Sequence, residues 1–210
     1  MCVKFRPFGD HTERYEKWFE KNRAVYESEL KVIKRLRPRQ EKGIEVGVGS
    51  GRFSQPFSIQ YGLDPSKEML KIAEERNIQT ILGRGEKLPF ETSVFDYLLI
   101  VTTICFFEDP LLALKESYRV LKSDGKIIIG FIDKDSLIGR EYQKKKEQNV
   151  FYREAEFYSV NEVEQMLKES GFSDFQHYQT IFQSVGSIEE VEESEEGYGR
   201  GSFVGIRARK

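Results

Sequence analysis

The sequence predicts an α/β fold with a doubly wound, mostly parallel sheet. After about residue 40, short apolar runs alternate with helical patterns. Two of the runs, Phe95–Val101 and 126–132, are nearly continuous in Leu, Ile and Val, which is typical of strands buried on both faces. Alternation in this order indicates right-handed βαβ units with helices on both faces of one sheet.

The remaining elements follow from the same patterns. We expect further strands at Gly43–Val46, 57–63, Gln79–Leu82, 172–184 and 202–209. Apolar residues at spacings near 3.6 predict one helix over 10–37, which Pro38 closes. Three later helices begin at Ser66, at the pair Asp109-Pro110 and at the capping box that starts with Ser159; the second runs through Leu121 and the third ends at Gly171. Residues 188–201 are predicted to be an exposed loop.

Length and composition indicate a single globular domain of 210 residues, with 39% hydrophobic and 32% charged residues. The two cysteines, Cys2 and Cys105, are too few and too far apart for a disulfide framework or a metal cluster, so we expect no metal site. No apolar run approaches the roughly 20 residues that a membrane span needs, and the first residues lack the apolar core of a signal peptide. We therefore expect a cytoplasmic protein with no membrane partner.

The charge balance bears on macromolecular partners. Formal net charge is −2, with 33 basic and 35 acidic residues. This balance argues against a nucleic acid partner, because such proteins carry an excess of positive charge. The sequence leaves the oligomeric state open.

A glycine-rich turn follows the first predicted strand. Gly47, Gly49 and Gly51 stand at alternate positions after Val46, where an open α/β sheet binds nucleotides. A dinucleotide fingerprint would place its third glycine at the position of Arg52, and a phosphate loop would carry Lys and Ser or Thr there. The turn therefore favours a nucleoside without a phosphate chain, and a tight turn without a ligand is the alternative.

Two acidic residues follow at the ends of later strands. Asp64 ends the second strand, where a carboxylate can accept hydrogen bonds from ribose hydroxyls. Its alternative role is to cap the next helix. Glu86 follows the third strand and could accept a hydrogen bond from an adenine amine while Leu88 packs on the base; the alternative there is a solvated loop.

Taken in order, these motifs resemble the class I S-adenosylmethionine-dependent methyltransferases, in their small-molecule, type 11-like branch. The motifs are Glu45-x-Gly-x-Gly-x-Gly51, Gly62-Leu-Asp64-Pro-Ser66-x-x-Met69-Leu70, Gly85-Glu86-x-Leu-Pro-Phe90, Phe95-Asp96, and Ala113-Leu-Lys-Glu-x-x-Arg119-Val-Leu-Lys122-x-x-Gly125. The resemblance is close over 40–132 and looser elsewhere. It implies a Rossmann-like methyltransferase fold, a seven-stranded sheet with its last strand antiparallel, and S-adenosylmethionine as the methyl donor.

The resemblance also implies roles for particular residues. Positions that match Glu45, Gly47, Gly49 and Gly51 surround the methionine part of the cofactor, and the position of Asp64 holds its ribose. The other implied contacts are Gly85, Glu86 and Lys87 beside the adenine, Val101, Thr102 and Thr103 past the sulfonium, and Pro65 and Met69 in the second motif. Tyr15, Trp18 and Phe19 could shield the sulfonium by cation–π contact, and core packing is the alternative for them.

No catalytic residue is assigned. Many relatives carry polar or His residues after the fourth strand, whereas this chain has apolar residues and a cysteine from Ile104 to Phe107. His11 is expected at the surface or in a cap, and His177 is expected to be buried in a strand. A base is needed only when the acceptor must lose a proton to attack.

The chain is expected to form one methyltransferase domain over 1–210. We predict a helical lid at 1–38, a cofactor-binding core at 39–132, a substrate-side insert at 133–158, and a helix with a strand pair at 159–210. The expected acceptor wall in the insert comprises Tyr142, Phe151, Tyr152, Phe157 and Tyr158. The acidic stretch 189–196 is interpreted as a solvated loop, with attraction of a cationic acceptor as the alternative.

The predicted function is methyl transfer from S-adenosylmethionine to a small molecule. The acceptor atom could be an amine, a hydroxyl or an activated carbon, and the amine is slightly favoured. A non-catalytic module that binds S-adenosylmethionine is the first alternative. An NAD-dependent oxidoreductase is the second, and the glycine spacing opposes it.

Overall fold

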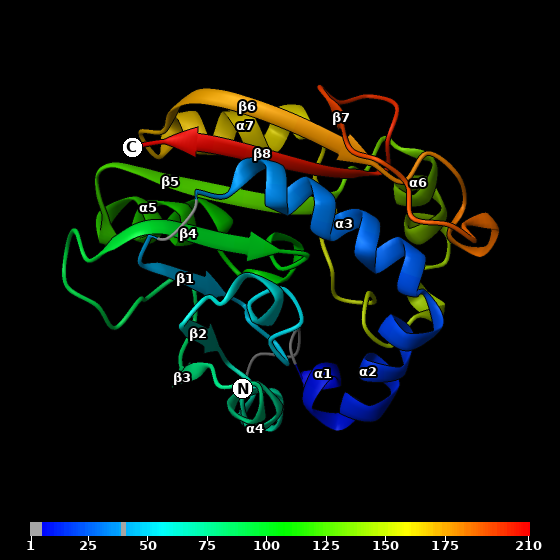
Figure 1. The fold of residues 1–210 in the computed structure, drawn as a ribbon, viewed down its shortest axis with the longest axis horizontal. Coiled ribbons are helices and arrows are strands. Elements are labelled where there is room, and N and C mark those ends of the chain that lie inside the picture. The colour runs from blue at the N-terminus through cyan, green and yellow to red at the C-terminus, as the bar shows by residue number, and fades with distance from the viewer. Residues whose placement is uncertain (1–5, 39–40) are drawn as a thin grey trace.

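The computed structural model describes residues 6–38 and 41–210, which fold around one mixed β-sheet with helices on both faces (Figure 1). The strand order is β3-β2-β1-β4-β5-β8-β6-β7. Strands from β3 to β5 pair in parallel, whereas β8 is antiparallel to both β5 and β6. The strands are β1 (Gly43–Val46), β2 (Tyr61–Asp64), β3 (Gln79–Leu82), β4 (Phe95–Val101), β5 (Leu121–Ile132), β6 (Ser173–Thr180), β7 (Glu195–Glu196) and β8 (Phe203–Arg209).

The predicted α/β class and the antiparallel last strand are confirmed. The seven expected strands are present, and β7 adds a two-residue eighth at the edge, paired with β6 through Tyr178 and Gln179. This strand lies in the segment 188–201, which apart from these two residues is the largely exposed loop that the sequence predicts. The Gln179 side chain anchors the segment, because its Oε1 accepts the backbone N–H groups of Arg200 (2.9 Å) and Gly201 (2.7 Å).

Two hydrophobic layers cover the sheet because strand side chains alternate between its faces. On one face, Tyr97 and Leu99 of β4 pack with residues of α3 such as Ile33. On the other, Leu98 and Ile100 pack with residues of α5 and α7. The helices are α1 (Arg6–Asp10), α2 (Thr12–Lys21), α3 (Arg23–Leu36), α4 (Lys67–Glu75), α5 (Pro110–Val120), α6 (Leu137–Lys144) and α7 (Val160–Glu169).

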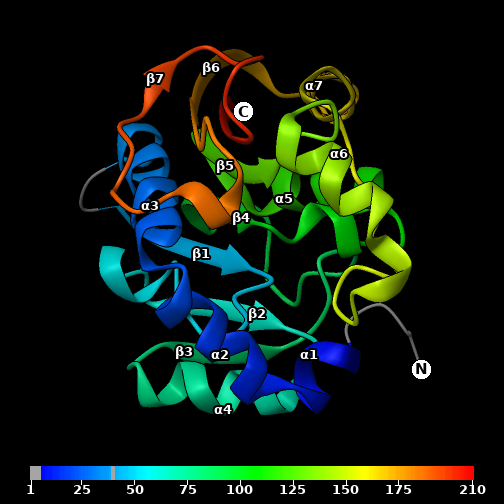
Figure 2. The ribbon, with the colours of Figure 1, turned by 90° about the vertical axis from the view of Figure 1, so that its right-hand side faces the viewer.

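The predicted single helix over 10–37 is instead two helices, α2 and α3, which are separated by a break at Asn22, and the short α1 ends at Asp10 before them. Asn22 leaves the helical conformation (φ −111°, ψ 44°), and its side-chain amide donates to the carbonyl oxygen of Trp18 at 2.9 Å. Asparagine favours such local bonds over a continuing helix. The break turns α2 away from α3, so that α1 and α2 lie beyond the carboxyl ends of the parallel strands (Figure 2).

The second strand was predicted at 57–63, but β2 begins at Tyr61. Gln55–Phe57 form a short 3₁₀ turn that contains Pro56, and Ser58 adopts a left-handed conformation (φ 54°), so the chain becomes extended only after these residues. The later β6 also ends earlier than predicted, at Thr180, because Ile181 is left-handed (φ 64°).

The three predicted helix starts are confirmed. Ser66 accepts the N–H of Met69, and Asp109 accepts that of Leu112 at 2.9 Å. Ser159 opens α7 with a complete capping box. The helix expected to include Leu121 ends one residue earlier, because Leu121 is already extended and begins β5. In the part of the chain that the structure describes, no helix is long and apolar enough to cross a membrane.

Candidate active site

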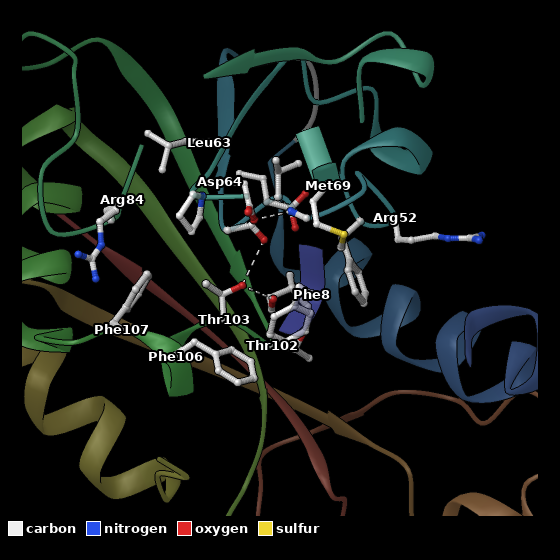
Figure 3. Close-up of a pocket in the computed structure, with 18 of the residues that line it drawn as sticks. Phe8, Arg52, Leu63, Asp64, Met69, Arg84, Thr102, Thr103, Phe106 and Phe107 are labelled. Atoms are coloured by element: carbon white, nitrogen blue, oxygen red, sulfur yellow. Dashed lines mark hydrogen bonds between the residues drawn. The ribbon is translucent and has the colours of Figure 1, made fainter. Parts of the chain in front are cut away.

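A narrow cavity of about 110 Å³ opens at the carboxyl ends of β1, β2 and β4 (Figure 3). We call it the strand-end cavity. All but three of the predicted cofactor residues line it: Tyr15, Glu45, Gly47, Gly49, Asp64, Pro65, Met69, Gly85, Glu86, Val101, Thr102 and Thr103. The sheet topology and the position of α2 together bring in residues that stand as much as 88 positions apart in the sequence, from Tyr15 to Thr103.

The glycine turn is shaped by close approach to its neighbours. Gly47 and Gly51 both have positive φ (76° and 85°). A Cβ on Gly47 would lie 2.1 Å from Cγ2 of Thr103, so this glycine lets the turn touch the segment after β4. A Cβ on Gly51 would lie 2.3 Å from Cδ1 of Ile78. Gly51 therefore serves packing beneath the turn, and it does not line the cavity.

Asp64 ties the end of β2 to the glycine turn. Its Oδ2 accepts the N–H of Gly49 at 2.9 Å, and its Oδ1 accepts the N–H of Ser66 at 2.8 Å. The helix cap itself is supplied by Ser66, so capping is not the main role of Asp64. Burial raises the pKa of Asp64 to about 6 against the opposing effect of these two bonds. Each oxygen keeps a second lone pair for a ligand.

Glu45 is the second buried carboxyl of the strand-end cavity. Its Oε2 accepts the hydroxyl of Ser54 at 2.5 Å, and 1% of the residue is exposed. Burial raises the pKa of Glu45 to about 8, the bond from Ser54 opposes that shift, and the nearby charge of Asp64 adds to it. Of the acidic residues that line this cavity, Glu45 and Asp64 are buried, which favours a ligand that donates hydrogen bonds or carries positive charge.

The segment after β3 forms an ordered turn, so the alternative of a solvated loop does not hold there. Glu86 accepts the N–H of Glu108 at 2.8 Å, and a Cβ on Gly85 would lie 2.7 Å from Cε1 of Phe107. Lys87 is exposed and does not line the cavity, contrary to prediction, because its backbone turns back to bond Arg84. Leu88 is buried in the main core, so it does not reach the cavity.

The end of β4 forms the opposite wall. Thr102 is held in a left-handed conformation (φ 48°), which costs a non-glycine residue energy and persists only where its surroundings enforce it. The Thr103 hydroxyl lies 2.9 Å from the carbonyl oxygen of Val101 and 3.2 Å from that of Gly47. These contacts fix the gap between the β1 and β4 ends.

A second, larger cavity of about 510 Å³ adjoins the first, and we call it the aromatic cavity. It is bounded by α2, α3, α6 and the segment after α6. Both cavities share five lining residues, namely Phe8, Tyr15, Phe53, Thr102 and Tyr152. Trp18 lines the aromatic cavity and not the strand-end cavity, so its predicted contact to a cofactor is not supported by its position.

The five aromatic residues predicted for the acceptor wall divide between two cavities. Tyr142, Phe151 and Tyr152 line the aromatic cavity, whereas Phe157 and Tyr158 lie against a separate small cavity beside Cys105. The acidic stretch 189–196 lines neither cavity. Its members are engaged elsewhere: Glu192 accepts the N–H of Phe182, and Glu193 pairs with Lys31.

Sequence reasoning missed several lining residues, among them Phe8, Glu29, Arg52, Phe53 and Phe106. Arg52 and Phe53 directly follow the glycine turn, so their position was a usable signal. Phe8 and Glu29 come from the N-terminal helices, and only the helix break at Asn22 decides how those helices lie over the strand ends.

The histidines contribute to neither cavity. His11 is exposed and packs edge-on against the ring of Phe151. His177 is half-buried in β6 with its Nε2 3.2 Å from Glu164, and burial lowers its pKa. Within residues 6–38 and 41–210, no group of three or more His, Cys, Asp or Glu side chains could hold a metal ion.

The site has the features of a nucleoside-binding α/β protein: a glycine turn after β1, an acid at the end of β2, and a cavity between them. Comparison with known proteins makes this more specific. The family model of a methyltransferase domain matches residues 44–129. The chain is 48% identical to an uncharacterized protein of Methanocaldococcus jannaschii over 203 residues, which is 97% of this chain and 98% of that protein.

Two further relatives have named activities. A crystal structure from Thermotoga maritima, described as a SAM-dependent methyltransferase and possible histamine N-methyltransferase, is 44% identical with a TM-score of 0.96 and covers 98% of this chain and 99% of that one. A demethylmenaquinone methyltransferase of a Geobacillus species is 29% identical over 147 residues, 58% of this chain and 63% of that protein. The chain belongs to the S-adenosylmethionine-dependent methyltransferases.

Proposed function

We propose that this enzyme transfers a methyl group from S-adenosylmethionine in the strand-end cavity to a small molecule in the aromatic cavity. The single observation that carries the proposal is the adjacency of the two cavities through five shared residues. S-adenosylmethionine supplies a methyl group on a positively charged sulfur, which departs as a neutral thioether. No proton has to be supplied to such a leaving group.

The residues present fit that cofactor. Glu45 and the bare backbone at Gly47 and Gly49 are suited to its amino-acid end, since all three residues line the strand-end cavity and the acid is buried. Asp64 is suited to the ribose hydroxyls, because both carboxylate oxygens are fixed by backbone donors and retain free lone pairs. Gly85 and Glu86 form the wall proposed for the adenine, with Phe107 packed behind it.

In this proposal the chain acts by orientation and by exclusion of water. Holding two reactants in a near-attack geometry is worth about 7–11 kcal/mol of barrier. Helices α1 and α2 form a lid, and the insert 133–158 supplies the acceptor wall through Tyr142, Phe151 and Tyr152. Phe8 and Tyr15 of the lid and Tyr152 of the insert stand between the cavities and would keep water from the transfer.

The proposed acceptor is a small molecule, with an amine favoured over a hydroxyl or an activated carbon. The aromatic cavity of about 510 Å³ lies within the usual range of small-ligand sites, roughly 300–1,000 Å³. The name of the Thermotoga maritima relative also supports an amine. We propose no nucleic acid partner, in view of the net charge of −2.

Calorimetry with S-adenosylhomocysteine, the demethylated cofactor, tests the proposal. The wild-type protein is expected to bind it, and Asp64→Asn is expected to weaken binding about 10- to 100-fold, because the charged acceptor for the ribose is lost, a contact worth about 1.5–3 kcal/mol. Lys87→Ala serves as the control, since Lys87 is exposed and outside the cavity. Absence of binding to the wild-type protein at millimolar ligand contradicts the proposal.

A further inference from the structure

A buried carboxyl, Glu29, lines the aromatic cavity from α3. Only 4% of the residue is exposed. Among the described residues no hydrogen-bond donor and no cation is paired with this carboxyl. The adjacent Ser28 does not serve it, because its hydroxyl donates to the carbonyl of Ala24 and accepts the N–H of Glu192.

The position of Glu29 on its helix makes the acid unusual. It stands four residues after Val25 and four before Ile33, so it occupies the apolar face with which α3 packs. A buried carboxyl without a partner is costly, and burial alone raises the pKa of Glu29 to about 8. A hydrophobic residue would pack there at lower cost, which indicates that the carboxyl serves a ligand.

The surroundings of Glu29 favour a cationic nitrogen as that ligand. Aromatic rings of Trp18, Phe53, Tyr142 and Tyr152 line the same cavity. Aromatic faces attract cations, and a carboxylate in a desolvated site pairs strongly with one. Glu29 is the one acidic residue among the described lining of this cavity.

We propose that Glu29 binds a positively charged nitrogen of the acceptor, so that the substrate class is small amines with an aromatic or apolar body. That this amine is the methyl acceptor rests on the proposed function, whereas its binding to Glu29 does not. The rings supply the contact for the body, and Glu29 supplies the countercharge.

The proton balance gives the proposal a distinctive signature. At pH 7 the free protein holds Glu29 mainly protonated, and a simple amine arrives mainly as its ammonium. One proton must leave as the pair forms, whichever of the two groups keeps the other proton. We therefore expect release of nearly one proton per amine bound at pH 7, and less release as the pH rises above 8.

Other groups at the cavity do not imitate this signature. Tyr142 of α6 has its pKa raised by burial to about 12, and burial also raises the pKa values of Tyr15 of α2 and Tyr152 of the insert. These phenols stay protonated between pH 6 and 9. The other charged groups of the described lining are cations of α2, namely Arg14, Lys17 and Lys21, which are exposed.

The experiment is calorimetry with 2-phenylethylamine and tryptamine, each compared with the alcohol that replaces its amino group. For at least one pair, wild-type protein is expected to bind the amine at least tenfold more tightly than the alcohol. Glu29→Gln is expected to abolish that preference. Glu27→Gln on the same helix is the matched control, since Glu27 pairs with the exposed Arg23 and lines neither cavity. Titrations in two buffers of different ionisation enthalpy measure the proton released.

Each outcome decides the proposal. An amine preference with proton release, both lost in Glu29→Gln and kept in Glu27→Gln, supports it. Equal binding of amines and alcohols by the folded wild-type protein overturns it, as does an amine preference that survives in Glu29→Gln. Binding of S-adenosylhomocysteine is measured on the same samples. If S-adenosylhomocysteine binds but amines are not preferred over alcohols, only the role of Glu29 is rejected. If S-adenosylhomocysteine does not bind, the proposed function is rejected.

Discussion

At the scale of single residues, the site depends on buried acids that line its two cavities. Asp64 has two backbone donors and Glu45 has the hydroxyl of Ser54, so both have partners within the fold. Glu29 has none among the described residues. Of the three carboxyls, Glu29 is therefore the one that a ligand would stabilise most.

The titration of Glu29 leads to a prediction about stability. Below pH 4.5 the group is neutral in the folded and unfolded chain alike, so it has no effect on the pH dependence. Between pH 4.5 and about 8 the unfolded chain ionises while the folded one stays protonated, so the carboxyl lowers stability progressively as pH rises. The free energy of unfolding of Glu29→Gln is therefore expected to exceed that of the wild type increasingly with pH.

The expected increase is about 1 kcal/mol per pH unit between pH 5 and 8, near the 1.36 kcal/mol that one pKa unit represents. Urea denaturation of both proteins at four pH values measures it. Glu27→Gln, which removes an exposed acid from the same helix, is the control. A constant difference between Glu29→Gln and wild type would show that Glu29 does not titrate as proposed.

At the scale of elements, one acid of α2, which is part of the proposed lid, ties this helix to the glycine turn and to the end of α4. Glu16 of α2 bonds Arg52 beside the glycine turn and Arg76 at the end of α4, each at 2.5 Å. All three side chains are about one-fifth exposed or less, so the pairs are only partly screened by water. Burial acts to raise the pKa of Glu16, but the arginines lower it overall.

Glu16→Gln is accordingly expected to loosen the lid. We expect a loss of about 1–3 kcal/mol of stability at pH 7, because two arginines lose a charged partner. Since the folded pKa of Glu16 lies below its usual value, this loss should shrink as pH falls through that pKa. Hydrogen exchange of the α2 amides, compared with Glu13→Gln at the exposed pair with Lys17, is the measurement. Unchanged exchange in Glu16→Gln would show that the ion pairs of Glu16 do not hold α2 in place.

At the scale of the whole molecule, much of the fold could be predicted because its signals are local. The helix caps at Ser66, Asp109 and Ser159 are predicted from the residues next to them. The strands β1, β3 and β4 are predicted from their apolar runs. The places where prediction failed depend on contacts distant in sequence. Gly51 points toward Ile78, and no local pattern shows that it packs beneath the turn rather than against a ligand.

The same distinction applies to the site. The glycine turn, Asp64 and Thr103 follow strands whose order a parallel sheet fixes, so their meeting could be anticipated. The aromatic cavity could not, because it depends on how α2 and α3 diverge at Asn22 and on where the insert returns. In the sequence, Glu29 is one of several charged residues in a helical pattern. Only the packing of α3 shows that it is buried.

The connection between the cavities predicts coupling between their ligands. Phe8, Tyr15, Phe53, Thr102 and Tyr152 line both, so a ligand in one cavity orders residues that the other ligand also touches. We expect S-adenosylhomocysteine to tighten binding of an amine about 5- to 50-fold, within the usual 1–3 kcal/mol range of coupling, and the amine to tighten binding of S-adenosylhomocysteine by the same factor. Calorimetric titration of each ligand with and without the other measures both factors.

Tyr15→Phe should preserve the coupling because the ring remains, whereas Tyr15→Ala should reduce it. Independent binding of the two ligands in the wild-type protein would mean that the shared wall does not couple them.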